Sequence, residues 1–280
     1  MQVNHLGGLG LAQGQNGAMR PLKKTNRALR KILERLSTAQ RINRASDDAA
    51  GLGVSEQLRT QIRGFKMASR NVADATSAVN IAEGAANEVS GMIQRQRELA
   101  VQARNDTLTD DQRRALDVEY QQLTAEITRI SDATQFNRQD VASGDDLADG
   151  NASIQVGPNA GDEITLPSVD MNAATLGIEG QSIATSVGAE QALQAADSAL
   201  DSLNSQRTTL GATVNRFESV TNNLAVAEIN TQAAESVLRD LDMARGLADL
   251  VRNQLLQEGA TRSLGRFNEI SANHLLGLIP

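Results

Sequence analysis

Apolar residues recur every seven positions along two long stretches of the chain, one in each half. The first stretch runs from Leu58 to Ala103 and the second from Ala189 to Leu224. In both, a second apolar row lies three or four positions after the first, so about two residues in seven form a narrow seam. Gln96 interrupts the first seam and Arg207 interrupts the second. This pattern predicts two long helices that pack along their whole length as a coiled coil.

The larger seam residues are the ones that we expect to hold this bundle together. Truncating a large buried side chain at such a position costs about 2 to 5 kcal/mol of stability. The predicted packing residues are Leu58, Phe65, Val72, Val79, Ile93, Leu203, Leu210, Phe217 and Leu224.

The two ends of the chain carry shorter apolar stripes. Glycines are frequent in residues 1–21, where each one weakens a helix interior by about 1 kcal/mol relative to Ala. We therefore expect a basic amphipathic helix only from about Leu22 to Leu36, and a disordered end before it in the free chain. A second amphipathic segment is expected from about Thr231 to Gln257. Neither stripe can make a core alone, so we expect them to pair with each other and with neighbouring molecules.

Between the long helices, the pattern predicts one more helix and a small β-hairpin. Residues 109–112 have the sequence of a capping box, which begins a helix. Residues 152–156 and 163–166 alternate as strands do, and the turn between them contains Gly and Pro. The buried stripe of the extra helix is expected to be Leu116, Leu123, Ile127 and Ile130.

These elements predict a mainly α fold, a long antiparallel helical bundle or coiled coil with a small β-hairpin region. We expect residues 1–44 and 231–280 to form terminal helices that are partly disordered in the monomer. Residues 45–230 are expected to form the bundle, with the hairpin region at about 138–186. That middle region is too short to hold a substantial outer domain.

The residue types argue against catalysis. Cysteine is absent, and the two histidines, His5 and His274, lie near the ends of the chain. No Walker, His-Glu-x-x-His or Gly-x-Ser-x-Gly pattern occurs, so we expect no enzyme, no cofactor and no catalytic residue. The segment from Asp145 to Asn151 is similar to a calcium loop without its closing Glu. A solvated acidic loop is favoured there over a metal site.

The charge pattern limits the kinds of partner. The net charge is −7, but basic residues are crowded between Arg20 and Arg44. Because no aromatic residue is near to stack on bases, we expect a solvated or partner-facing helix surface and no nucleic acid. No apolar run approaches the roughly 20 residues that span a bilayer. The N-terminus lacks the regions of a signal peptide, so any export is expected to use a route that does not read one.

Several segments carry a family resemblance. The segment from Glu34 to Leu52 reads Glu-Arg-Leu-Ser-Thr-Ala-Gln-Arg-Ile-Asn-Arg-Ala-Ser-Asp-Asp-Ala-Ala-Gly-Leu and closely resembles the N-terminal signature of bacterial flagellins. Further segments resemble the family in the same order and at its spacing. They are Gln94–Gln102, Glu126–Asn137, Ile154–Gly157, Thr175–Gly177, Leu210–Phe217 and Asn222–Leu224.

The resemblance implies a structural subunit of the flagellar filament, a homopolymer of flagellin subunits that serves motility. In the family, the terminal helices form an inner layer around a channel, and the longer helices with a hairpin surround them. The chain resembles a short flagellin with little or no variable outer domain. The resemblance also implies an extracellular location, reached without a cleaved signal peptide through the flagellar type III export apparatus. The implied partners are an export chaperone and the hook-associated and cap proteins.

The resemblance also implies a possible host receptor. In flagellins that the animal surface receptor TLR5 recognises, one motif presents an Arg, a Leu and a Gln, and the following helix presents a Glu. Arg95, Leu99, Gln102 and Glu119 match these positions. The alternative is that these residues serve only subunit packing.

Two other functions stay open on the sequence. A hook-filament junction protein shares the terminal helices, although Arg41-Ile42-Asn43 and Asn215-Arg216-Phe217 favour a flagellin. A chemoreceptor-like signalling coiled coil would also have long heptads, but it needs a membrane span or a partner domain. The chain departs from the family at its ends, where residues 6–21 hold five glycines and Pro21.

Overall fold

The computed structural model describes the backbone of residues 4–276 and the side chains of residues 19–270. The chain divides into two compact units. The terminal unit contains residues 1–59 and 232–280, and the central unit contains residues 60–231. Each unit is described by itself.

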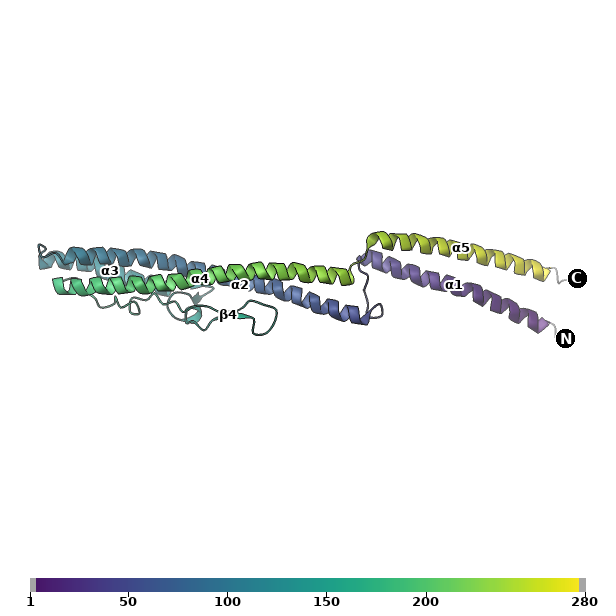
Figure 1. The fold of residues 1–280 in the computed structure, drawn as a ribbon, viewed down its shortest axis with the longest axis horizontal. Helices are drawn as coiled ribbons and strands as arrows, with labels where there is room; N and C mark the ends of the chain where they lie inside the picture. Colours follow the sequence, from purple (N-terminus) through teal and green to yellow (C-terminus); the bar gives the residue numbers. More distant parts are fainter. Residues whose placement is uncertain (1–3, 277–280) are drawn as a thin grey trace. The chain divides into compact units, whose positions relative to one another are not determined.

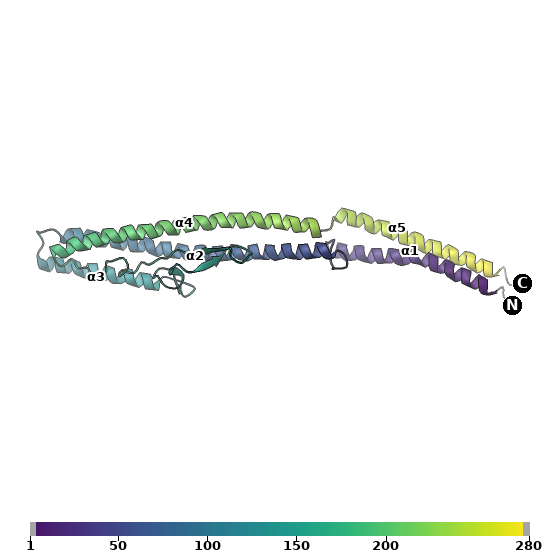
Figure 2. The same cartoon turned by 60° about the horizontal axis from the view of Figure 1, so that its bottom comes forward.

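In the terminal unit, two helices lie side by side (Figures 1 and 2). They are α1 (Asn4–Thr38) and α5 (Met243–Leu276). The apolar side of α1 turns towards α5, since Leu22, Leu29 and Ile32 are partly buried. The expected helix start at about Leu22 is wrong, because α1 already begins at Asn4 and continues through Pro21. Packing along a neighbouring helix can outweigh the poor helix propensity of glycine and the hydrogen bond that proline lacks.

Two connections between helices lie in the terminal unit, one at residues 39–48 after α1 and one at residues 240–242 before α5. The expected continuous segment from Thr231 to Gln257 is divided, because three residues separate the end of α4 (Ser186–Arg239) from the start of α5. There the two chain segments pair: the backbone N–H of Arg41 donates to the carbonyl of Arg239 at 2.7 Å. The N–H of Leu241 donates to the carbonyl of Ala39 at 2.9 Å, and Ala39 has a positive φ of 55°. These bonds satisfy backbone groups that the helix ends leave free.

The central unit is the helical bundle that the heptads predict. It is made of most of helix α2 (Ala49–Ala103), most of helix α4 and all of helix α3 (Asp110–Ala133), which packs beside them (Figure 1). The mainly α fold with a long antiparallel bundle is confirmed.

The capping box of α3 is confirmed, and the expected stripe faces the core, which also buries polar residues that were not expected there. Thr109 accepts a hydrogen bond from the backbone of Gln112, and the Gln112 side chain accepts one from the backbone of Thr109. Of the four expected stripe residues, Ile127 is fully buried, and the other three are partly buried against the core. The fully buried positions of α3 are Arg113, Tyr120, Thr124, Ile127 and Ser131. The side chains of Arg113, Thr124 and Ser131 donate to backbone carbonyls there, which an apolar pattern cannot reveal.

The predicted β-hairpin is present and short. Strands β3 (Ser153–Gln155) and β4 (Glu163–Thr165) pair antiparallel, with Ile154 opposite Ile164. A second two-stranded pair, β1 (Gln135–Phe136) with β2 (Gln139–Asp140), follows α3 and was not expected. A single 3₁₀ turn, η1 (Asp146–Ala148), lies between the two pairs.

Candidate assembly surface

The central unit buries most of the predicted packing residues within one chain. Ile93, Leu203 and Phe217 have no exposed surface, and four more of the predicted residues are buried with at most 6% of their surface exposed. Phe65 in the central unit and Leu58 in the terminal unit are only partly buried. The remaining buried residues of the predicted set are Val72, Val79, Leu210 and Leu224. These side chains are therefore used for folding of the single chain.

Both polar interruptions of the seams have partners. The Gln96 amide, fully buried, donates to the hydroxyl of Thr124 at 2.7 Å and to the carbonyl of Tyr120 at 3.3 Å. Its oxygen has no hydrogen-bond partner among the described residues. The Arg207 guanidinium donates from two nitrogens to one carboxylate oxygen of Glu83, at 3.0 and 3.1 Å. Each interruption thus links two helices of the bundle.

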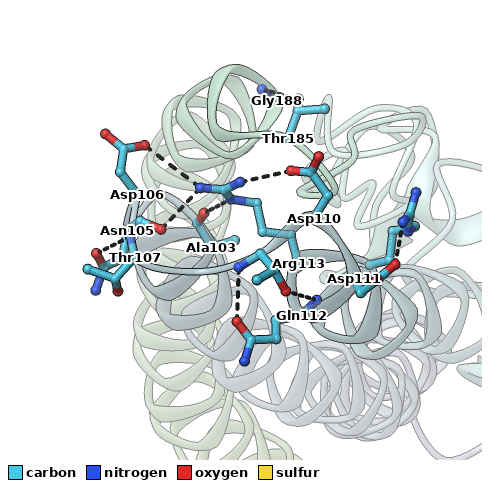
Figure 3. Close-up of polar contacts among 12 residues, drawn as sticks. Ala103, Asn105, Asp106, Thr107, Asp110, Asp111, Gln112, Arg113, Thr185 and Gly188 are labelled. Atoms are coloured by element: carbon cyan, nitrogen blue, oxygen red, sulfur yellow. Dashed lines mark hydrogen bonds and ion pairs between the residues drawn. The ribbon is translucent and has the colours of Figure 1, made fainter.

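The turn between α2 and α3 is organised by a buried arginine (Figure 3). The Arg113 guanidinium donates to the carbonyls of Ala103 at 2.9 Å and Asn105 at 3.1 Å, at the end of α2. It also pairs with Asp110 at 3.0 Å. Arg113 therefore satisfies carbonyls that the C-terminus of α2 leaves without helical partners. Further along α3, burial raises the pKa of Tyr120 to about 12.

The four residues matched to receptor contacts lie near each other but differ in exposure. Arg95 on α2 donates to the Glu119 carboxylate on α3 at 2.9 Å and also pairs with Glu98 at 3.1 Å. The hydrogen bond that Arg95 donates to the Glu119 carboxylate raises the pKa of Arg95. Gln102 is exposed, whereas Leu99 is 1% exposed and belongs to the core. A partner on this surface could reach three of the four side chains.

The terminal unit leaves an apolar stripe uncovered. On α5, Leu247, Val251 and Leu255 follow one another at intervals of four residues and are 51%, 53% and 64% exposed. Ala248 and Leu256 line the same open groove. A different side of α5 turns towards α1, because Leu250, Gln257 and Leu264 are partly buried. Helix α5 therefore has a second apolar side available to another molecule.

The chain turn in the terminal unit is held by charged groups. The Arg239 guanidinium, whose side chain is 10% exposed, pairs with the Glu56 carboxylate at 2.8 Å and donates to the Gln40 side chain at 3.1 Å. The hydrogen bond from Arg239 lowers the pKa of Glu56. Arg41 donates to the carbonyl of Leu238 at 2.7 Å. These contacts fix the start of α2 against the end of α4 within the unit.

The loop before α2 is closed by Asp47. Its carboxylate pairs with Lys31 at 2.5 Å and accepts from the backbone N–H groups of Asn43 and Arg44, each at 3.4 Å. The hydrogen bond from Lys31 lowers the pKa of Asp47 although partial burial opposes this. Asp48 instead caps α2, accepting from the N–H of Gly51 at 2.9 Å.

The local sequence Ser46-Asp47-Asp48 is typical of a helix cap, but it does not reveal these separate roles. Lys31 lies sixteen residues before Asp47, so no local spacing signals their pairing. Arg113 and Arg239 were missed for the same reason, since both act on carbonyls or carboxylates of other helices. The apolar spacing of Val251 and Leu255 was visible, but sequence alone did not show that α1 leaves them uncovered.

A helical unit with an uncovered apolar stripe is typical of a coiled-coil protein that assembles with copies of itself. Family comparison agrees with this class. Residues 12–146 match the bacterial flagellin N-terminal helical region, and residues 193–278 match the bacterial flagellin C-terminal helical region. The chain belongs to the bacterial flagellin family.

Relatives match over most of their length. The chain is 43% identical to a flagellin of Halalkalibacterium halodurans over 241 residues, which is 85% of this chain and 88% of the relative. It is 38% identical to a flagellin of Bacillus subtilis, covering 91% of this chain and 94% of the relative. The flagellar filament 31.3 kDa core protein of Treponema maltophilum is also 38% identical, with the same coverages.

A solved structure supports the fold. A protein of Vibrio parahaemolyticus described as flagellar hook-associated superposes with a TM-score of 0.56 at 14% identity, covering 69% of this chain and 99% of that one. At this identity the likeness concerns the fold alone. It therefore does not favour the hook-filament junction alternative over the flagellin relatives.

Two sequence expectations concern metal ions and membranes. Among the residues that the structure describes, Asp145, Asp146 and Asp149 do not come together as a metal-binding cluster. None of the helices in the described part of the chain is long and apolar enough to cross a membrane.

Proposed function

We infer that this chain is a structural subunit of the bacterial flagellar filament. Its membership of the flagellin family supports this function, and the relatives include filament core proteins. The observation that carries the proposal is the stripe of Leu247, Val251 and Leu255 on α5. This stripe lies on a helix within the family's C-terminal region and is uncovered in the single chain.

The stripe suggests how copies of the chain join. Burying three such side chains against a neighbouring copy removes apolar surface from water, worth about 1.5 to 3 kcal/mol for each full burial. The free chain cannot bury them, because α1 occupies another side of α5. Folding of the central unit and assembly through the terminal unit thus use different apolar residues. In this arrangement the terminal regions 1–44 and 231–280 form the inner layer of the filament, and 45–230 form the layer around it.

The filament location places the chain outside the cell, as part of the flagellum. Export without a cleaved signal peptide belongs to the same proposal, as do an export chaperone and the cap and hook-associated proteins as partners. These partners are supported by the family resemblance. A structural role without catalysis also fits the family.

Seeded polymerisation tests the function. Purified chain is mixed with short sheared filaments made from the same protein, and growth is followed by light scattering and electron microscopy. We expect filaments that lengthen from the seeds at a rate that rises with the concentration of free chain. Chain that stays monomeric beside intact seeds, while circular dichroism shows it folded, would contradict the function.

Receptor binding is a second proposal, favoured by the pairing of Arg95 with Glu119 across α2 and α3. This pair and the exposed Gln102 form one accessible polar surface for TLR5. In a reporter-cell assay, monomeric protein should activate the receptor, and Arg95→Ala should weaken activation. Equal activation by Arg95→Ala and by the wild type would reject this surface.

A further inference from the structure

Charge is divided unequally between the two units of the chain. The terminal unit carries fifteen Lys and Arg against ten Asp and Glu, a net charge of +5. The central unit carries twelve Lys and Arg against twenty-four Asp and Glu, a net charge of −12. Together they give the −7 of the whole chain. One subunit thus contains two units of opposite sign.

Much of the positive charge lies on one side of α1. Arg20, Lys23, Lys24, Arg27 and Arg30 are all exposed. At about 100° per residue they lie within roughly a third of the helix circumference. We call these five residues the basic face of α1. None of the five forms an ion pair with a residue that the structure describes.

Elsewhere on α1, charged side chains form ion pairs where a residue of opposite charge is near. One residue beyond the basic face, Lys31 pairs with Asp47 at 2.5 Å, and further along α1 Glu34 pairs with Arg44 at 2.8 Å. Like charges three or four residues apart on a helix repel one another, so an external anionic surface would stabilise the basic face. Such a surface must carry several carboxylates or other anions close together.

The central unit has an excess of carboxylates, many of them in one stretch of the sequence. Between Arg138 and Arg207 the sequence has no Lys or Arg and contains eleven Asp and Glu. Glu190 pairs with Arg104 and Asp197 pairs with Arg97. The other nine form no ion pair with a described residue. They are Asp140, Asp145, Asp146, Asp149, Asp162, Glu163, Asp170, Glu179 and Asp201.

We propose that the basic face of α1 binds carboxylates on the central unit of a second copy of this chain. The proposal rests on the proposed function, because the second copy is another subunit of the same polymer. Within a polymer, each basic face meets acidic central units at a high effective concentration. A nucleic acid or an anionic membrane would instead be repelled by the −12 charge of the central unit.

Zero-length cross-linking tests the contact directly. Filaments are grown from an equal mixture of unlabelled and ¹⁵N-labelled chain and treated with a carbodiimide, which joins Lys to carboxylate only at contact distance. Mass spectrometry should find Lys23 or Lys24 of one isotope joined to Asp or Glu within residues 60–231 of the other. Filaments that yield other cross-links between copies but none of this kind would overturn the proposal.

Charge reversal measures the effect of the contact on assembly. Lys23→Glu with Lys24→Glu keeps good helix formers and should raise the critical concentration for elongation at low salt by about three- to tenfold. The wild type should lose assembly as NaCl rises, because salt screens the attraction, and the variant should be less sensitive to NaCl. Arg63→Glu with Arg70→Glu is the matched control. These two exposed arginines of the central unit also lack a described ion pair, and the control should show neither effect.

The outcomes separate this proposal from the function on which it rests. Wild-type chain that does not elongate seeds contradicts the filament function. If the wild-type chain elongates seeds and the Lys23 and Lys24 variant has the same critical concentration and salt response, only the charge contact is contradicted. Binding of the basic face to anionic vesicles or DNA at physiological salt, without Lys cross-links in the filament, would assign the face to a polyanion and overturn the proposal.

Discussion

The two units of the chain use their apolar residues in opposite ways. Among the described residues, the buried hydrophobic side chains lie in the central unit, from Ala68 to Leu224, with the single exception of Ile42. In the terminal unit, large apolar residues of α5 such as Val251 and Leu255 stay more than half exposed. The core of the central unit is therefore complete within one chain, whereas the terminal unit has apolar surface left for other copies of the chain.

The sharpest contrast is between matched truncations in the two units. Phe217→Ala removes a fully buried ring from the central core and should cost about 3 to 5 kcal/mol of unfolding free energy. Leu255→Ala removes a side chain that is 64% exposed and should change that free energy by less than about 0.5 kcal/mol. Urea unfolding of the two monomeric variants measures both values. Similar losses of unfolding free energy in both variants would contradict the difference between the two units.

Replacing the buried arginine of the α2–α3 turn should lower the free energy of unfolding by less than truncating Phe217 does. Arg113→Met keeps an unbranched side chain but removes the donors to the carbonyls of Ala103 and Asn105, at a cost of about 2 kcal/mol. Arg114→Met is the control. Arg114 lies next to it on α3, is exposed and pairs only locally with Asp111. Thermal unfolding should separate the two variants, and equal midpoints would show that Arg113 does not cap α2.

The buried amide of the central core should be replaceable. Gln96→Leu removes an amide whose oxygen lacks a described partner, and Thr124 keeps its own hydrogen bond to the carbonyl of Tyr120 at 3.0 Å. We expect a gain of about 1 kcal/mol in unfolding free energy. Gln94→Leu, at an exposed position two residues earlier, should give no such gain. A clear loss of stability in Gln96→Leu would show that the polar link is needed for folding.

The smallest expected effect on stability is in the loop before α2, which Asp47 closes. The pKa of this carboxyl lies below its ordinary value of 3.8, so its stabilising effect is fully present above that value. The effect is lost as the pH falls through the lowered pKa. Asp47→Asn should mimic the acid state at neutral pH, so the amides of Asn43 and Arg44 should exchange hydrogen faster.

Asp249→Asn is the control for this change. Asp249 is exposed on α5, and its replacement should leave exchange in the loop unchanged. Unchanged exchange in Asp47→Asn would show that the carboxylate does not hold the loop.

The sequence predicts the central unit well because its seams follow a strict period. The heptads locate α2 and α4, the capping box of Thr109 and Gln112 locates α3, and the alternation of Ile154 and Ile164 with polar neighbours locates the hairpin. Each of these signals is local. A residue at a seam position of the heptad pattern therefore also turns its side chain towards the core of the folded bundle.

Other features depend on contacts between distant segments and left no local signal. The start of α1 at Asn4 contradicts the propensity of its glycines, because propensity is a weak term beside packing. The roles of Arg113 and Arg239 come from donors that meet carbonyls or carboxylates of other helices. The exposure of Leu247 depends on which side of α5 lies against α1, and the apolar pattern of α5 alone does not decide this.

The most direct test of the role of the α5 stripe measures both folding and assembly in the same two variants. Val251→Gln with Leu255→Gln removes the uncovered stripe, and Val118→Gln with Val187→Gln removes two exposed valines of the central unit, 60% and 70% exposed, as the control. Unfolding of the monomer and elongation of wild-type seeds are measured for both. We expect wild-type unfolding in both variants, elongation in the control, and no elongation in the α5 variant. Elongation of the α5 variant at the wild-type rate would contradict the claim that this stripe joins the copies.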